Sequence, residues 1–391
     1  MDRKARFGII GSAGLIGNYH TDVLSKGQGD YQLTALCDID RPRLEDQCRR
    51  LNLPGTADGL ELVRRDDVDA VVVAVPHPLH SKYALAAVEA GKDVLIEKPL
   101  AATPGDARAM LKAIRKSKRI AGIHYQGRTR PTIQKARAMI DAGELGHLLC
   151  IRLTGSYYKS DYYYSLGGWR GTWKGEGGGV LINQAPHDID TMCFLAGGQA
   201  PAELLARWAN QYHANSQAED IAFACGRFAN GCEFALNVSV SLHGDVSRFE
   251  VFGSGGALTI TNGVFTRYVR YQQDLLDFAR SYGGPNPYAG PEVEEQPLPP
   301  AEGENDPTLI HKRLAQAVLT RDKKKLVVSA FEGLWSMETI AGIFLSGYAK
   351  KAVKLPVSAW RYDKMLQDLI ANAPPVERAQ AAAQEGMQAK F

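Results

Sequence analysis

The sequence predicts an α/β fold in which a doubly wound parallel sheet is followed by an α+β domain with a large, mostly antiparallel, open-faced sheet. The chain of 391 residues is longer than one typical hydrophobic core supports. Its first part alternates short apolar runs with helical patterns, whereas its middle part joins strand-like runs by short loops. We therefore expect domains at 1–125 and 126–357, followed by a C-terminal tail at 358–391 that forms a helical arm or is disordered.

The first domain is predicted from near-continuous apolar strands separated by helices of about ten residues or more. This pattern is typical of parallel sheets that are covered on both faces. The predicted strands are 6–11, 32–38, 68–75, 93–98 and 119–125. The predicted helices are 15–26, 41–52, 79–90 and 104–116.

A helix predicted at 131–142 leads into the second domain, where strand-like runs follow one another. These runs are 148–158, 202–212, 220–229, 232–242, 247–254 and 256–262. Short loops between such runs favour antiparallel pairing, which can leave one face free for a substrate or a second subunit. Residues 275–305 are rich in Gly, Pro and Glu and are predicted to be a loop, and helices are expected again at 306–320 and 329–350.

Composition excludes several classes of function. A formal net charge of +3, without a block of Lys and Arg, does not indicate a nucleic-acid partner. There is no apolar run of the roughly 18 residues that a membrane span needs and no secretory signal pattern, so we expect a cytoplasmic protein with no membrane partner. The six cysteines are scattered and are expected to be free thiols.

A glycine-rich turn between the first strand and the first helix is the first candidate site. Its spacing, Gly11-x-x-Gly14-x-x-Gly17, is one residue longer than the usual dinucleotide fingerprint. Such a turn brings backbone amides to a pyrophosphate at the positive end of a helix. The predicted cofactor contacts here are Gly11, Ser12, Ala13, Gly14, Leu15 and Ile16.

Asp38 follows the second strand, where a carboxylate would accept hydrogen bonds from the adenosine ribose. The alternative is an N-cap for the helix that begins at Arg41. A carboxylate repels a 2′-phosphate, so NAD is favoured, while the nearby Arg41 and Arg43 leave NADP as the less favoured choice.

Two segments carry the candidate chemistry. Lys98 ends a buried strand within Glu-Lys-Pro, at the edge of a parallel sheet where ligands bind, although its side chain could instead extend to solvent. Asn183, His187 and Asp190 fall on one face if residues 176–190 form a helix. His187 would then serve as acid or base, and Asp190 would either orient it or make a structural hydrogen bond.

Residues 76–80 follow the third long strand and reach the same edge. Pro76, His77 and His80 are predicted to contact the cofactor, and Glu97 to brace its pocket. A metal site is disfavoured here because no Cys or carboxylate completes a ligand set, and the sequence predicts no metal.

An aromatic, glycine-rich segment at 157–179 precedes this helix. Aromatic faces bind the apolar faces of pyranose rings, although packing within a loop or between subunits would explain the same composition. The predicted substrate contacts are Lys98, Tyr125, Arg128, Tyr163, Trp169, Arg170, Asn183 and His187.

These motifs together resemble the Gfo/Idh/MocA oxidoreductases, the family of glucose–fructose oxidoreductase and inositol dehydrogenase. The resemblance rests on residues 8–20, 74–101, 136–152 and 177–190. It implies a Rossmann domain that holds NAD(P) in a cleft against a C-terminal α/β domain, a sugar or cyclitol substrate, and homodimers or homotetramers formed through the open sheet. It also implies that Lys98 lies near the substrate hydroxyl and the nicotinamide and that His187 is the acid/base. Asn183 departs from the family pattern, in which Asp is frequent.

The predicted function is an NAD-dependent dehydrogenase for a secondary hydroxyl of a sugar, glycoside or cyclitol. Two alternatives remain. The first is a glycoside hydrolase or lyase of the same family that oxidises C3 transiently, eliminates the aglycone and restores NAD in each cycle. The second is an inactive sensor that holds NAD and a sugar.

Overall fold

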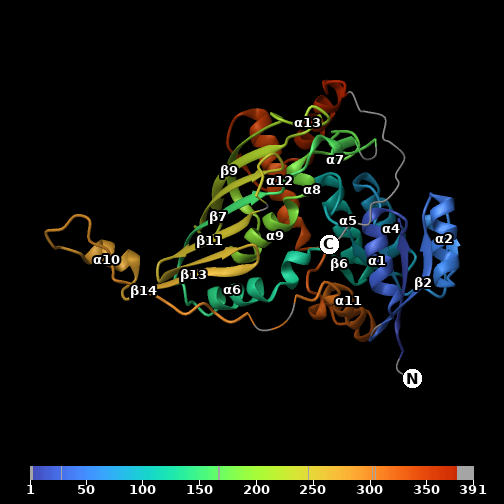
Figure 1. Cartoon of the computed structure of the whole chain (residues 1–391), viewed down its shortest axis with the longest axis horizontal. Helices are drawn as coiled ribbons and strands as arrows, with labels where there is room; N and C mark the ends of the chain where they lie inside the picture. Colours follow the sequence, from blue (N-terminus) through green and yellow to red (C-terminus); the bar gives the residue numbers. More distant parts are fainter. Residues whose placement is uncertain are drawn as a thin grey trace.

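The computed structural model describes residues 3–27, 29–165, 168–244, 246–301, 303 and 305–376. Two sheets lie side by side with helices between them, the N-terminal one in blue and teal and the larger one in green to orange (Figure 1). Within the described ranges, no helix is both long enough and apolar enough to cross a membrane.

The first sheet is parallel throughout, in the order β3-β2-β1-β4-β5-β6, which confirms the doubly wound prediction. Its strands are β1 (Ala5–Ile10), β2 (Tyr31–Cys37), β3 (Gly55–Thr56), β4 (Ala70–Val73), β5 (Asp93–Ile96) and β6 (Ala121–Ile123). Its helices are α1 (Leu15–Ser25), α2 (Arg41–Leu51), α3 (Gly59–Leu62), the 3-10 turn η1 (His77–Leu79), α4 (His80–Glu89) and α5 (Pro104–Ser117). Both faces of the sheet are buried, because β4 and β5 consist almost entirely of apolar residues that pack on helices on either side.

The second sheet has nine strands in the order β14-β13-β12-β11-β7-β10-β9-β8-β15. Neighbouring strands pair antiparallel except β7 with β10, so the mostly antiparallel prediction is confirmed. The strands are β7 (Leu148–Ser156), β8 (Pro201–Ala209), β9 (Ile221–Phe228), β10 (Glu233–Ser239), β11 (Ser247–Gly253), β12 (Gly256–Thr261), β13 (Val264–Tyr271), β14 (Val293–Glu295) and β15 (Val353–Lys354).

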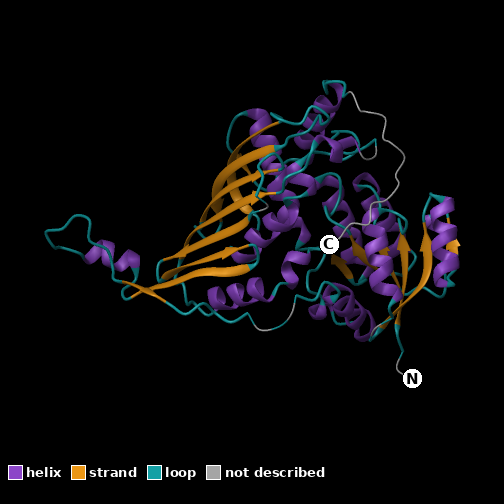
Figure 2. Cartoon of the chain, in the orientation of Figure 1, coloured by secondary structure: helices purple, strands orange, loops and turns teal. Residues whose placement is uncertain are grey.

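Helices cover the face of this sheet that is turned toward the first domain (Figure 2). They include α6 (Pro131–Asp141), α7 (Asp161–Ser165), α8 (Val180–Asn183), α9 (Pro186–Leu195), α12 (Gly333–Ala349) and α13 (Ala359–Ala371), with the 3-10 turn η2 (Gln126–Thr129) before α6. The opposite face carries no helix among the described residues, and the side chains of Leu205 and Phe223 are 48% and 43% exposed. The sheet is therefore open on one side.

The first domain is completed by a distant segment. α11 (Leu309–Thr320), followed by the turn η3 (Lys323–Lys325), packs Ile310, Leu314 and Val318 against Phe7 and other residues of the first sheet. The predicted boundary at residue 125 therefore does not contain the whole core of that domain, since a helix from beyond the second sheet fills one side.

Two segments are more ordered than the sequence suggested. The predicted loop at 275–305 contains α10 (Leu275–Ser281) and β14, which pairs with β13 and extends away from the body of the molecule (Figure 1). The predicted tail begins with α13, whose Tyr362 and Met365 are buried in the core of the second domain. Residues 377–391 lie outside the described residues.

Candidate functional site

The glycine turn before α1 has three distinct roles for its glycines. Gly11 has φ +88°, a value that favours glycine, and a Cβ there would overlap the backbone oxygen of Ala74. A Cβ on Gly17 would overlap the backbone oxygen of Gly11, so Gly17 lets the helix pack on the turn. Gly14, the N-cap of α1, has nothing closer to its Cβ position than an oxygen at 3.6 Å. The extra residue is thus absorbed between Gly11 and Gly14, and the open position at Gly14 fits a pyrophosphate at the start of the helix.

The other residues predicted to contact the cofactor at this turn do not all face its open side. Asp38 accepts hydrogen bonds from Ala13 N at 2.8 Å and Asp40 N at 2.9 Å, which fixes its carboxylate beside the turn and uses the Ala13 amide. Asp40, not Asp38, caps α2, so the capping alternative for Asp38 is wrong. The buried Ser12 donates its hydroxyl to Gln47 rather than toward the open side. Leu15 and Ile16 are 57% and 39% exposed, which leaves an apolar edge available to a ligand.

Lys98 connects the two domains at the carboxyl edge of the first sheet. It follows β5, and its Nζ donates a hydrogen bond to the backbone oxygen of Asn183 at 2.7 Å and lies 3.5 Å from Asn183 Oδ1. Burial lowers the pKa of the Lys98 amine. The structure therefore brings the Glu-Lys-Pro segment and the segment 176–190 together.

His187 lies in α9 beside this lysine. Burial, followed by the charge of Lys98, lowers the pKa of His187 to about 3, so its imidazole is neutral at physiological pH. Its Nδ1 is buried and has no hydrogen-bond partner among the described residues. The ring packs edge-on against Tyr125, with centroids 5.7 Å apart, while the Tyr125 hydroxyl bonds Ser336 Oγ at 2.6 Å. Because Nδ1 is buried while the residue is partly exposed, a ligand would meet the ring through its other nitrogen, Nε2.

The predicted single helical stripe is wrong. Residues 176–190 form two helices, α8 and α9, because Pro186 has no N–H to continue a helix through position 185. Asn183 thus ends one helix while His187 starts the next. Asp190 is directed to Arg128 and not to His187: Arg128 Nε and Nη2 bond its two oxygens at 2.7 Å and 2.9 Å.

This ion pair is buried. Both Arg128 and Asp190 are at most 1% exposed, and the guanidinium lies over the ring of Phe194, 4.0 Å from its centroid. Arg128 and Asp190, which were predicted to be site residues, therefore form a buried structural pair.

The residues after β4 also lie at the carboxyl edge of the first sheet, but their polar atoms face the protein. Pro76 precedes η1. His77 Nδ1 lies 2.9 Å from the backbone oxygen of Glu176, and burial lowers the pKa of His77 to about 3. His80 Nδ1 and Nε2 lie 2.7 Å from Pro99 O and 2.8 Å from Val75 O. His80 therefore fixes the ends of two strands against each other.

A buried cluster around Glu97 was missed by sequence reasoning. Glu97 Oε1 lies 2.9 Å from His20 Nε2 and 2.5 Å from His124 Nδ1, and His20 Nδ1 lies 2.8 Å from His311 Nε2. Burial raises the pKa of Glu97, but His124 and His20 outweigh it and hold that pKa well below its usual range. The three histidines offer ligand atoms within 4.8 Å of one another, a grouping that could hold a metal ion. The distance between His20 Nδ1 and His311 Nε2, 2.8 Å, is that of a hydrogen bond and is shorter than the roughly 3.3 Å between tetrahedral ligands that bond lengths of about 2.0 Å give.

The aromatic segment forms the remaining wall of the site. Arg170 Nη1 donates to the hydroxyl of Tyr163 at 2.7 Å, and its guanidinium stacks against the rings of Tyr163 and Trp169. Asn183 Nδ2 donates to the same hydroxyl at 3.0 Å, and Trp169 packs edge-on against His77. The predicted substrate contacts Tyr163, Trp169, Arg170 and Asn183 therefore form one connected group.

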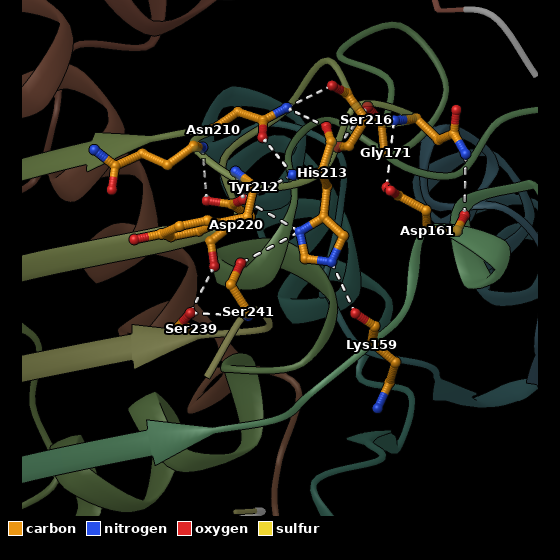
Figure 3. Close-up of polar contacts among 12 residues, drawn as sticks. Lys159, Asp161, Gly171, Asn210, Tyr212, His213, Ser216, Asp220, Ser239 and Ser241 are labelled. Atoms are coloured by element: carbon orange, nitrogen blue, oxygen red, sulfur yellow. Dashed lines mark hydrogen bonds and ion pairs between the residues drawn. The ribbon is translucent and has the colours of Figure 1, made fainter. Parts of the chain in front are cut away.

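A polar network around His213 holds this segment in place (Figure 3). His213 Nε2 lies 2.8 Å from Lys159 O and its Nδ1 lies 3.1 Å from Asp220 Oδ2. Burial opposes protonation, but the hydrogen bond to Asp220 outweighs it and raises the pKa of His213. Nearby, Ser216 Oγ donates to Gly171 O at 3.2 Å. The network thus connects Lys159 and Gly171 of the aromatic segment to the loop before β9.

Glu176 is a second residue that the sequence analysis did not single out. Its side chain is 2% exposed and accepts hydrogen bonds from Gly171 N at 2.6 Å and from Asn183 Nδ2. Its position immediately before three glycines could have indicated a special backbone turn at this site. Gly177 and Gly178 indeed have positive φ values of 85° and 159°.

Comparisons with known proteins agree with this architecture. Residues 5–125 match the model of the oxidoreductase family with an NAD-binding Rossmann fold, and residues 133–259 match the GFO/IDH/MocA C-terminal domain. Both the resemblance and the expectation of an NAD-binding Rossmann domain are thereby confirmed.

Two curated relatives and one solved structure illustrate the match. A 1,5-anhydro-D-fructose reductase of Ensifer adhaerens is 34% identical over 198 residues, which cover 51% of this chain and 58% of that protein. A levoglucosan dehydrogenase of Pseudarthrobacter phenanthrenivorans is 27% identical over 263 residues, which cover 60% of this chain and 67% of that protein. The WlbA dehydrogenase of Bordetella pertussis, solved with NADH and UDP-GlcNAcA, superposes with a TM-score of 0.74 at 22% identity, covering 91% of this chain and 100% of that one. The matches thus span between about half and two thirds of the curated relatives, and the structural likeness concerns the fold.

Proposed function

Because the chain belongs to the GFO/IDH/MocA oxidoreductase family, we propose that it is an NAD-dependent dehydrogenase that acts on a secondary hydroxyl of a sugar, glycoside or cyclitol. The observation that carries this proposal is the meeting of Lys98 with Asn183 and His187 at the carboxyl edge of the parallel sheet. Ligands of open α/β sheets bind at this edge.

The two titratable groups have complementary properties. Lys98 is a cation held by the carbonyl oxygens of Asn183, so it can stabilise negative charge that develops on a substrate oxygen. His187 is neutral and partly exposed, and Nε2 is the ring nitrogen that is not among the buried unpartnered atoms, so we assign Nε2 to accept the hydroxyl proton during oxidation and return it during reduction. When bound, NAD supplies the hydride acceptor. We assign Lys98 as the polarising donor and His187 as the acid/base.

The cofactor preference follows from the turn before α1. Asp38 is fixed beside the turn by two backbone amides, and a carboxylate in this position disfavours a 2′-phosphate. Arg43, which could attract that phosphate, lies 3.4 Å from Asp40. These contacts support NAD over NADP.

The substrate class follows from the aromatic wall. Trp169 and Tyr163 offer ring faces, and Arg170 and Asn183 offer donors, a combination suited to a ring that carries several hydroxyls. The relatives named above act on levoglucosan and on 1,5-anhydro-D-fructose. These observations support a pyranose-like or cyclitol substrate.

The open face of the nine-stranded sheet supports self-association. Leu205 and Phe223 are exposed on β8 and β9, and large apolar side chains left exposed on an uncovered sheet face are typical of a protein interface. We propose a homodimer or homotetramer that forms through this face. Light scattering of the purified protein tests this, with Leu205→Glu as the disrupting variant.

The experiment for the activity is an NAD(P)-coupled screen of sugars, glycosides and cyclitols with His187→Ala as the control. We expect NADH to accumulate at 340 nm in proportion to the substrate consumed, and the variant to lose the activity while still binding NAD. Release of an aglycone without net NADH would indicate the redox-cycling hydrolase instead. A screen that shows bound NAD but no hydride exchange with any compound would contradict both enzymatic functions and favour a sensor.

A further inference from the structure

Glu176 lies near Lys98, and each oxygen of its carboxylate accepts a hydrogen bond. Oε2 accepts a hydrogen bond from Gly171 N and Oε1 accepts one from Asn183 Nδ2. The side chain is 2% exposed, so these contacts replace water. Burial raises the pKa of Glu176, and the hydrogen bonds from Gly171 N and Asn183 Nδ2 and the charges of Arg170 and Lys98 oppose that rise. A donor on each oxygen also fixes the direction of the carboxylate.

The side-chain amide of Asn183 connects the Glu176 carboxylate to Lys98. Its Nδ2 donates to Glu176 and to the hydroxyl of Tyr163, so both amide hydrogens are used and Oδ1 is turned toward Lys98 Nζ at 3.5 Å. If the amide were flipped, Oδ1 would face the Glu176 carboxylate and the NH₂ group would face the Lys98 ammonium. Both contacts are repulsive, so the hydrogen-bond network allows one orientation only. The backbone oxygen of Asn183 completes the acceptors around Lys98 at 2.7 Å.

Lys98 needs a counter-charge because its surroundings oppose its protonation. Burial and the nearby Arg170 lower its pKa, while Glu97 and Glu176 raise it. Glu97 is already shared between the imidazoles of His20 and His124 on the other side of the strand. Glu176 is therefore the acidic group on the side of Lys98 that carries Asn183.

We infer that Glu176 is a positioning residue that acts through Asn183: it fixes the direction of the Asn183 amide and of Lys98 Nζ, and it adds a second negative charge near Lys98 to that of Glu97. This inference rests on the proposed dehydrogenase function. It also accounts for Asn183, where the family resemblance leads us to expect Asp. A carboxylate is still present near Lys98, but it belongs to Glu176, and the Asn183 amide lies between the two.

The test measures Lys98 directly and does not require turnover. The midpoint for Lys98 acetylation by acetic anhydride is followed against pH by peptide mass spectrometry in the full-length protein without substrate. We expect Glu176→Gln to lower this midpoint by about one pH unit or more, because a nearby opposite charge is lost. Adding Asn183→Asp to that variant restores the charge next to Lys98 and should return the midpoint to near its original value.

Glu219 provides a matched control. It is a second buried carboxyl group of the same region that accepts backbone hydrogen bonds, from Gly179 N at 2.8 Å and Leu181 N at 2.9 Å. Burial raises its pKa to about 8, so Glu219→Gln removes a charge only in the alkaline part of the titration. Glu219→Gln should leave the Lys98 midpoint unchanged. If Glu176→Gln does not fold, Asn183→Ala and Asn183→Asp are compared instead, and the first should lower the midpoint while the second raises it.

An unchanged midpoint in Glu176→Gln, or a double variant that stays as low as the single one, would overturn the inference, as would equal midpoints for Asn183→Ala and Asn183→Asp. Once a substrate is known, the alkaline limb of the kcat/KM profile should shift with the labelling midpoint. Failure to find any substrate would count against the dehydrogenase proposal and would leave the labelling result to decide on Glu176.

Discussion

Lys98 Nζ donates a hydrogen bond to the backbone oxygen of Asn183 at 2.7 Å, and this contact joins the parallel sheet to the second domain. The lysine follows β5, whereas the asparagine ends α8, 85 residues later. Because the bond crosses the boundary between the domains, it aligns a cation from one with an imidazole from the other.

Replacing Lys98 should impair chemistry more than cofactor binding. Lys98→Met retains the length of the side chain and removes the ammonium, so the developing charge on a substrate oxygen loses its donor. We expect kcat to fall by roughly 10² to 10³, with little change in NADH affinity measured by fluorescence titration. A variant with near-normal kcat would show that the ammonium does not polarise the substrate.

The pH dependence of oxidation should reflect the low pKa of His187. Because burial and Lys98 lower that pKa to about 3, the imidazole stays neutral well below the usual pKa of about 6.5. We expect kcat/KM for oxidation to show no histidine limb between about pH 5 and 7. An acid limb near pH 6.5 that disappears in His187→Gln would mean that the base titrates as an ordinary exposed histidine.

Two glycines of the cofactor turn should respond differently to alanine. A Cβ at Gly17 overlaps the backbone of Gly11 and Ser12, so Gly17→Ala should lower the melting temperature and NAD affinity together. Gly14 has φ −69° and open space, so Gly14→Ala should keep the melting temperature and weaken NAD binding alone, because a methyl group blocks the approach of the pyrophosphate. Calorimetry and NAD titration of both variants distinguish the two roles. Equal NAD affinity in Gly14→Ala and the unmodified protein would place the pyrophosphate elsewhere.

The pair between Arg128 and Asp190 should matter for stability. Both side chains are buried, so Asp190→Asn leaves the Arg128 guanidinium with only the longer contact to Glu332, 3.4 Å from Nη1, and should cost up to about 3–5 kcal/mol of the free energy of unfolding. Urea denaturation measures this, and Arg128→Met combined with Asp190→Leu should cost less than the sum of the two single changes. If Asp190→Asn kept full stability and lost activity, Asp190 would belong to the reacting group instead.

The aromatic wall should loosen as the pH rises through the pKa of His213. Its folded-state pKa is raised above that of an unfolded histidine, so its contribution to stability is complete below about pH 6.5 and is lost as the pH rises through the folded value. The difference in melting temperature between the unmodified protein and His213→Gln should therefore shrink with rising pH. A difference that is constant from pH 5 to 9 would mean that the charge on His213 does not hold Lys159 and Asp220.

The parallel sheet and its glycine turn could be predicted because their signals are local. Buried strands of Val, Ile and Leu recur between helices of similar length, and the glycines of the turn are adjacent in sequence. The second sheet was predictable in class but not in extent: the strand β14 lies in a segment rich in Gly, Pro and Glu that has few strand-forming residues.

Parts of the site could not be predicted because they depend on tertiary contacts. His311 contacts His20 only because α11 packs on the first sheet, nearly 200 residues after β6 in the chain, whereas His20 and His124 reach Glu97 from within the first domain. The partner of Asp190 also depends on how η2 lies against α9. Helical spacing alone suggested a stripe with His187, whereas the missing N–H of Pro186 breaks that helix.

The central claim is that Lys98 and His187 act together on a secondary hydroxyl. The most direct test is transfer of deuterium from the carbinol carbon of an accepted sugar or cyclitol to NAD, measured by mass spectrometry of the reduced cofactor in a single turnover. We predict direct transfer by the unmodified protein and a rate at least about 100-fold lower in Lys98→Met and in His187→Ala. Transfer at an unchanged rate in either variant, with NAD still bound, would contradict the claim.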